Sequence, residues 1–274
     1  MYKSIILTVL FFAYSLYGYS QRNNFLSRSE IGIMGGGTYY IGDLNPIQHF
    51  KNTQPSLGIL FRHSIHSRFS LRANVLYGSV KADDKESNVD LFINRNLSFN
   101  STIFELSGGV EFNYLPFEVG HKKYKGTAYL TAGIGVFKMN PIGEFDGDML
   151  ALQPLGTEGQ SSSLSSISPY SLTQLAIPFG VGMRASLSRR ISINLEFGVR
   201  KTFTDYLDDV RSDTFINTEV LAQENGPITA AMSNKNLNNS INGYRGDSST
   251  KDWYIFTGFM LMIKLGDPSN CFYH

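Results

Sequence analysis

The sequence alternates between apolar and polar residues over long stretches, and this alternation limits what the chain can fold into. From Ile191 to Arg200 the odd-numbered residues are Ile, Ile, Leu, Phe and Val, and the even-numbered residues are Ser, Asn, Glu, Gly and Arg. Successive side chains of a β-strand point to opposite faces, so this segment has one apolar and one polar face. The segments Phe69–Tyr77 and Phe104–Tyr114 repeat the pattern. The sequence therefore predicts two-faced β-strands.

Five further segments follow the pattern less strictly, with glycine or alanine often on the polar side. They are Glu30–Gly42, Pro55–Ile65, Thr127–Lys138, Thr173–Leu187 and Trp253–Leu265. Together the segments predict eight strands of about 10 to 15 residues, whereas soluble strands usually have about five or six. A tilted strand of this length is long enough to cross a membrane.

Short and long connections alternate between the expected strands. The short ones are residues 66–68, 116–126 and 188–190; the long ones are approximately 43–54, 81–100, 139–172 and 205–252. Outer-membrane barrels have short periplasmic turns and long outer loops. We therefore predict an all-β fold, an eight-stranded antiparallel up-and-down transmembrane β-barrel with both termini in the periplasm. The alternative is a soluble, lipocalin-like barrel with its apolar face inward, which the strand length and loop asymmetry disfavour.

Aromatic residues near the strand ends also favour a membrane barrel. Amphipathic rings are expected to form girdles where the protein meets lipid headgroups. We expect the outer girdle to include Tyr77, Phe104, Phe203 and Trp253, and the inner one Phe69 and Tyr114.

The first twenty residues have the pattern of a secretory signal. Lys3 precedes the apolar run Ile5–Leu16, and the small residues Gly18 and Ser20 precede the expected cleavage before Gln21. The apolar run is too short for a comfortable transmembrane helix. The chain is thus expected to comprise a signal peptide (1–20), an outer-membrane barrel (21–266) and a periplasmic tail (267–274), located in the cell outer membrane of a Gram-negative bacterium.

Composition and motifs disfavour several classes of function. The 24 Lys and Arg residues nearly balance the 23 Asp and Glu residues, so no basic field is available for nucleic acid. Cys271 is the only cysteine, which excludes sites built on cysteine pairs and leaves its own role open. The sequence has no Gly-x-Ser-x-Gly elbow, and no histidine pair has the spacing of a helical metal site. We therefore expect no enzyme activity, no cofactor and no small-molecule substrate.

The polar faces of the strands carry charges that the barrel would enclose. We expect these residues inside: Arg62, Arg72, Glu105, Glu111, Arg184, Glu196 and Arg200. An eight-stranded barrel is wide enough only to be filled by side chains, and buried charges require partners. The sequence predicts a salt-bridged plug. A gated solute path is the alternative, and the narrow barrel argues against it.

Acidic residues cluster where the seventh expected strand ends. A calcium site at Asp205, Asp208 and Asp209 is conceivable, because calcium prefers carboxylate ligands, but their spacing matches no known calcium loop. The alternative, which we favour, is a capped or salt-bridged strand end. They begin the long segment 205–252, which is rich in Asn, Ser and Gly. Segments of this length are usually functional or disordered. Contact with a neighbouring protein is one role that this loop could have.

Three stretches resemble a known family. They are Gly35–Leu44 (GGGTYYIGDL), Pro178–Gly182 (PFGVG) and Glu196–Val210 (EFGVRKTFTDYLDDV). The residues that carry the motif are Gly42, Asp43, Leu44, Asp205, Tyr206, Leu207, Asp208 and Asp209. Together the stretches resemble the PorG-like outer-membrane barrels of Bacteroidota, which are linked to the type IX protein secretion system.

The resemblance implies a structural role. Barrels of that family are thought to help anchor a periplasmic ring made of a lipoprotein and a partner subunit, and they have no catalytic residues to carry over. Contacts with these partners would then involve the periplasmic side, with residues 21–29, the turn that contains Lys122, Lys123 and Lys125, and the tail 266–274. The alternative is a stand-alone barrel of the outer-membrane-protein-A type, which would serve envelope integrity or surface adhesion.

Overall fold

The structure is a computed structural model that describes residues 28–236 and 243–266. The expected signal peptide (1–20), the tail (267–274) and Cys271 lie outside the described residues. Within the described residues, no helix combines the length and apolar character needed to cross a membrane.

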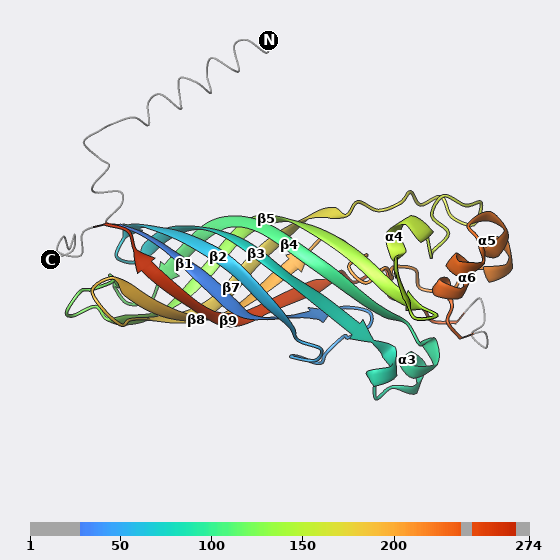
Figure 1. The fold of residues 1–274 in the computed structure, drawn as a ribbon, viewed down its shortest axis with the longest axis horizontal. Coiled ribbons are helices and arrows are strands. Elements are labelled where there is room, and N and C mark those ends of the chain that lie inside the picture. Colours follow the sequence, from blue (N-terminus) through green and yellow to red (C-terminus); the bar gives the residue numbers. More distant parts are fainter. Residues whose placement is uncertain (1–27, 237–242, 267–274) are drawn as a thin grey trace, which may run out of the picture.

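Eight antiparallel strands close into a barrel (Figure 1). Its strands are β1 (Ser29–Ile41), β2 (Gln54–His66), β3 (Phe69–Asp83), β4 (Ser98–Asn113), β5 (Gly126–Phe145), β7 (Thr173–Ser186), β8 (Ile191–Thr202) and β9 (Trp253–Lys264). Each barrel strand pairs with the next along the chain, and β9 pairs with β1 to close the ring. A closed barrel leaves no strand edge unpaired. The predicted eight-stranded antiparallel barrel is confirmed.

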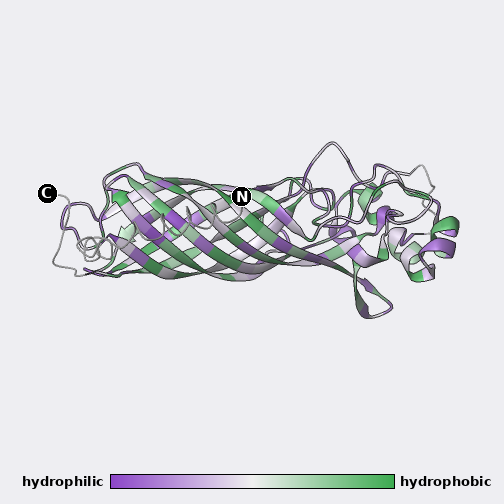
Figure 2. Ribbon diagram, turned by 90° about the horizontal axis from the view of Figure 1, so that it is seen from above, coloured by the Kyte–Doolittle hydropathy of each residue, from purple (hydrophilic) through white to green (hydrophobic). Residues whose placement is uncertain are grey.

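Apolar side chains cover the outside of the barrel. Ile134 is 75% exposed, and the large apolar residues of the other strands, such as Ile33, Leu106 and Phe259, also face outward and are exposed. In Figure 2 the barrel strands that form this apolar belt alternate between hydrophobic and hydrophilic residues along their length. A soluble barrel with an inward apolar face is therefore excluded, because the buried inner face contains the arginines and glutamates instead.

The expected aromatic residues lie at the two edges of the belt. Tyr77, Phe104 and Phe203 are exposed at the end with the long loops, here called the loop end, and Trp253 is half-buried there. Phe69 and Tyr114 are exposed at the opposite end, here called the turn end.

Three strands are longer at the loop end than the sequence suggested. Strand β3 runs to Asp83, β4 begins at Ser98 and β5 continues to Phe145, so the expected loop limits at 81, 100 and 139 are wrong. The reason is a reversal of the two faces. Beyond the belt the inner face becomes apolar, with buried Val80 and Met139, and the outer face becomes polar.

The long loops form a folded cap at the loop end (Figure 1). They contain η2 (Asp84–Glu86), α3 (Asp90–Arg95), the short strand β6 (Asp148–Ala151), α4 (Leu152–Leu155), α5 (Thr218–Glu224) and α6 (Pro227–Ser233). Leu152, Leu207 and Met232 from these loops share one apolar core with Phe99 and Phe137 inside the barrel. The last loop, which the sequence showed to be rich in Asn, Ser and Gly with a few apolar residues, thus packs into the barrel mouth through those apolar residues.

The inner wall is also less polar than expected. A second apolar cluster lies on the inner faces of β1, β2, β3 and β9, and its members are Met34, Leu60, Leu76, Phe256, Met260 and Met262. At the turn end, the link between β4 and β5 folds back so that Phe117 and Val119 are buried, and the Nζ of Lys264 lies 3.3 Å from Oε1 of Glu118. Side chains therefore occupy the barrel from end to end.

An arginine placed in the middle of the belt tests which surface meets lipid. We predict that Ile134→Arg lowers the free energy of unfolding in a bilayer by about 2–4 kcal/mol, because the charge would enter hydrocarbon. The matched control is Asn140→Arg, on the same face of β5 but beyond the belt, which should change it by less than about 0.5 kcal/mol. Denaturant titration in lipid vesicles measures both, and equal costs would contradict a lipid-facing belt.

Candidate functional site

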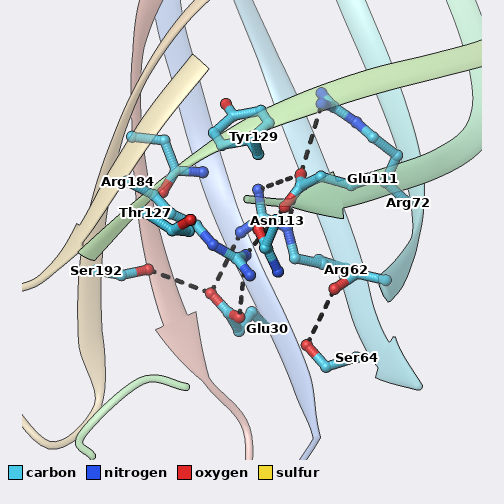
Figure 3. Close-up of polar contacts among 12 residues, drawn as sticks. Glu30, Arg62, Ser64, Arg72, Glu111, Asn113, Thr127, Tyr129, Arg184 and Ser192 are labelled. Carbon is cyan, nitrogen blue, oxygen red and sulfur yellow. Dashed lines mark hydrogen bonds and ion pairs between the residues drawn. The ribbon is translucent and has the colours of Figure 1, made fainter. Parts of the chain in front are cut away.

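The seven charged residues expected in the lumen are all buried inside the barrel, at 6% exposure or less. Four arginines come from β2, β3, β7 and β8, and three glutamates from β4 and β8. The placement follows from the alternation of side chains along a strand, because the residues next to each of these charged residues point outward. Figure 3 shows how most of these side chains converge on one another.

Glu111 is the centre of the network. Its Oε2 accepts hydrogen bonds from Arg62 Nε at 3.1 Å and Nη2 at 2.9 Å, and lies 3.7 Å from Arg72 Nη1. Its Oε1 lies 3.1 Å from Nη1 of Arg184. Three guanidinium groups from three strands thus share this carboxylate as a counter-charge (Figure 3).

Two further carboxylates complete the interior pairs. Glu196 accepts hydrogen bonds from Arg72 Nη1 at 2.7 Å and from the Tyr129 hydroxyl at 2.8 Å. Glu105 accepts hydrogen bonds from Arg200 Nε at 3.1 Å and from the Tyr254 hydroxyl at 2.9 Å. Charged hydrogen bonds of this kind satisfy buried groups that would otherwise be costly to desolvate.

Sequence reasoning missed the fourth carboxylate, Glu30. Its Oε2 lies 3.4 Å from Arg62 Nη1 and accepts a hydrogen bond from the Ser192 hydroxyl at 3.2 Å. Glu30 makes the interior set neutral, with four arginines against four glutamates. The signal was present in the sequence, because Glu30 has the opposite parity to the outward-facing Ile31 and Ile33.

The network leaves little free space in the lumen. The cavity between Arg72, Glu196 and Arg200 has a volume of about 20 Å³. A single water needs roughly 10–15 Å³ by this measure. The geometry therefore favours a filled plug over a solute path at this level of the barrel.

The residues that carry the sequence resemblance gather at the loop end rather than in the lumen. Gly42, Asp43 and Leu44 follow β1, and Asp205–Asp209 follow β8 shortly beyond its end. All except Gly42 are buried at the base of the cap, together with Asp252, which precedes β9.

One tyrosine hydroxyl joins two of these carboxyl groups. The Oη of Tyr40 lies 2.5 Å from Oδ2 of Asp208 and 2.8 Å from Oδ1 of Asp252. A phenol has one proton to donate, so it can bond to only one carboxylate at a time. Burial raises the pKa of both aspartates well above the usual range, assisted by Asp252 and Asp43 in the case of Asp208 and by Asp205 and Asp43 in the case of Asp252.

Other acidic groups of the cap are also hard to ionise. Burial, assisted by nearby Asp205, raises the pKa of Asp43 to about 7. Burial raises the pKa of Asp205 to about 6, although Lys251 lies 3.1 Å from its Oδ2. Burial raises the pKa of Asp209 to about 7 despite hydrogen bonds from Thr157 and Tyr170 that lower it.

Two buried arginines tie the loops of the cap together. Arg95 donates to both carboxylate oxygens of Asp84 at 2.7 Å, to the carbonyl of Arg245 at 2.6 Å and to the carbonyl of Asp43 at 3.0 Å. Arg245 in turn pairs with Glu158. These bonds join segments that lie far apart in the sequence.

The carboxylates of the acidic cluster point to different partners. In residues 28–236 and 243–266, no three His, Cys, Asp or Glu side chains are arranged to hold a metal ion. Asp208 contacts Tyr40, Asp209 contacts Thr157 and Tyr170, and Asp205 contacts Lys251. Their carboxylates are engaged in separate contacts.

The lysines proposed for partner contact lie apart from both clusters. Lys122, Lys123 and Lys125 are exposed on the β4–β5 link at the turn end. Exposed Arg189 and Arg190 belong to the β7–β8 turn at the same end. The turn end of the barrel therefore presents several unburied cations.

Removing the central charge of the lumen tests the network. We predict that Glu111→Gln lowers the free energy of unfolding by about 3–5 kcal/mol, because buried arginines lose their counter-charge. Glu219→Gln, an exposed position on α5, is the control and should have little effect. Heat-modifiability on gels and denaturant titration measure the difference, and a stable Glu111→Gln barrel would show that the network is dispensable.

The acidic cap should loosen as the pH rises. The pKa values of Asp43, Asp205 and Asp209 lie above the model-peptide value of 3.8, so the folded cap binds protons more tightly than the unfolded loops do. Its stability is then greatest at acidic pH and is lost as the pH rises through about 6 to 7. Hydrogen-exchange protection of residues 205–210, corrected for intrinsic rates, should fall over that range.

A substitution distinguishes the titration of these carboxyl groups from a general loosening of the protein at alkaline pH. In Asp209→Asn the side chain is neutral at every pH, so the fall in protection should be shallower. Asp148→Asn, an exposed site on β6, should keep the full pH dependence. Protection that does not change with pH in the unmodified protein contradicts the assignment of protonated carboxyl groups to the cap.

Among solved structures, the chain is similar to Neisserial surface protein A, with 8% identity, a TM-score of 0.43 and coverage of 87% of this chain and 97% of that one. It is also similar to Ail of Yersinia pestis in complex with a heparin analogue (8% identity, TM-score 0.38, 85% and 97% coverage). A further match is the outer membrane protein OprG of Pseudomonas aeruginosa (9% identity, TM-score 0.37, 86% and 96% coverage). Similarity of this degree says nothing about activity.

No curated protein matches the sequence significantly. One family model does match, over residues 4–153, which is more than half of the 274-residue chain. The matched region includes strands β1 to β5 and Asp43 of the acidic cap. The chain therefore belongs to the DUF6089 family, a domain of unknown function.

Proposed function

We propose that this chain spans the bacterial outer membrane as a non-enzymatic barrel and serves as a structural or anchoring component of the type IX protein secretion machinery. The observation that carries the membrane assignment is the reversal of the strand faces. Within the belt the apolar side chains point out, and beyond it, at Val80 and Met139, they point in. Such a reversal is expected where the outer face of a strand passes from lipid into water.

The filled interior supports a structural role over transport. Four arginines and four glutamates neutralise one another inside the barrel, and the cap closes the loop end. The lumen carboxylates Glu30, Glu105, Glu111 and Glu196 are all engaged by arginine, tyrosine or serine side chains. Groups bound in this way are poorly suited to acid–base catalysis.

The turn end supports an anchoring role. We place it in the periplasm, where short turns of outer-membrane barrels lie. Exposed Lys122, Lys123 and Lys125 then face the compartment of the ring and lipoprotein subunits of the secretion system. The buried residues Asp43 and Asp205–Asp209 lie at the opposite end of the barrel, where Asp208 contacts Tyr40 and Asp205 contacts Lys251.

A second candidate function is a stand-alone barrel of the outer-membrane-protein-A type. The observation that favours it is the folded cap, which would present an ordered surface outside the cell. Under this alternative the cap mediates adhesion or supports the envelope, and loss of the protein leaves secretion intact.

Charge reversal at the turn end separates the two functions. We predict that Lys122→Glu with Lys123→Glu leaves the barrel folded, prevents co-purification of periplasmic ring proteins from gently solubilised membranes, and reduces export of secreted cargo. The charge-matched control is Lys85→Glu with Lys138→Glu, two exposed lysines toward the loop end. Absence of ring proteins from the purified unmodified barrel, together with an intact secretome in a deletion strain, would favour the stand-alone barrel.

A further inference from the structure

The β1–β2 loop, residues 42–53, follows a different course from the other long loops. Figure 1 shows it turning back beside the barrel wall, while α4, α5 and α6 lie farther out in the cap. Its position is fixed by outward-facing residues of the barrel. The hydroxyl of Tyr39 on β1 lies 3.0 Å from Nδ1 of His49, and the rings of Tyr39 and Phe50 are 5.2 Å apart.

The loop reaches the apolar belt. The ring of Phe50 lies 6.4 Å from that of Phe197 on β8, although the loop begins and ends on β1 and β2. Phe197 pairs with Thr257 of β9, which pairs with Gly37 of β1. The loop therefore crosses the outside of β9. Small residues make room for it, because a Cβ on Gly37 would come within 2.3 Å of Thr53 Cγ2.

Two large apolar side chains of this loop are mostly exposed. Ile47 is 81% exposed and Phe50 is 58% exposed. Phe50 also has φ +63°, a left-handed conformation that is unusual for a bulky residue. Backbone strain of this kind persists only when the surroundings hold it in place, and it often accompanies a functional position.

The loop is held rigidly in this shape. The Nδ2 of Asn45 donates to the carbonyls of Tyr40 at 2.8 Å and Gln48 at 2.9 Å, and the Thr53 hydroxyl donates to the Phe50 carbonyl at 2.7 Å. On its polar side, Lys51 Nζ donates to the carbonyl of Glu86 at 2.6 Å. The loop thus has a fixed apolar tip and a polar side tied to η2.

We propose that Ile47 and Phe50 insert into the acyl chains of the outer leaflet beside β8 and β9, so that the β1–β2 loop anchors the barrel in lipid. The inference rests on the proposed membrane location. Lipid is the occupant because the tip is continuous with the belt: Phe50 packs on Phe197, whose neighbours Leu195 and Val181 are exposed belt residues. Amphipathic segments at this depth bind membranes by burying apolar side chains beside polar ones.

A single tryptophan reporter tests the proposal. Trp253 is the only tryptophan, so Trp253→Phe provides a background for Ile47→Trp. The protein is reconstituted into phosphatidylcholine vesicles whose acyl chains carry bromine, a contact quencher. We expect the fluorescence at position 47 to be quenched as strongly as that of Leu195→Trp in the belt. Leu91→Trp, on exposed α3, should keep its intensity.

The controls separate the possible failures. Quenching at position 195 without quenching at position 47 overturns the loop anchor and leaves the membrane location intact. Absence of quenching at both positions overturns the membrane location as well.

A charge introduced at the tip of the β1–β2 loop provides a second test of its insertion into lipid. With the tryptophan at position 47, Phe50→Asp should abolish the quenching, because the carboxylate would hold the tip in water. Asn52→Asp adds the same charge in the same loop, at a residue that tolerates its left-handed φ of +54°, and should leave the quenching unchanged. Equal effects of the two variants would contradict insertion of Phe50.

Discussion

The rest of the structure depends on charge neutrality inside a narrow closed sheet. A barrel that turns its apolar faces outward must place the alternate residues in its lumen, where an unpaired charge would be prohibitively costly. Four arginines and four glutamates meet this constraint, and Glu111 alone contacts Arg62, Arg72 and Arg184. Because these partners lie on different strands, the same ion pairs that neutralise the interior also fix how the strands pack against one another.

The polar side chains inside the barrel differ along its axis, with ion pairs within the belt and a group of buried carboxylates at the loop end. Within the belt, ion pairs share the lumen with the methionine-rich cluster around Met34 and Met260. At the loop end the hydroxyl of Tyr40 lies between the carboxylates of Asp208 and Asp252, and burial raises the pKa of both well above the usual range. A structure closed in these two ways is suited to holding a fixed shape, in agreement with a role in anchoring.

The sequence predicted the barrel well because alternation is a local property. Parity alone placed Arg62 and Glu196 inside, and the same argument applied to Glu30 would have made the interior neutral. The extensions of β3 and β5 were missed because the apolar residues change face where the belt ends. The base of the cap was inaccessible to sequence reasoning, since Tyr40 meets Asp208 and Asp252 across separations of 168 and 212 residues.

The most direct test of the account is a scan of spin-label accessibility along β8 in lipid vesicles. Single cysteines would be introduced from Ile191 to Arg200 in a Cys271→Ser background and labelled, and collisions with oxygen and with a water-soluble nickel complex would be measured. The account predicts high oxygen accessibility at odd-numbered positions and low accessibility to both reagents at even-numbered ones. Access of the nickel complex to the odd-numbered positions would contradict a lipid-facing belt and the function built on it.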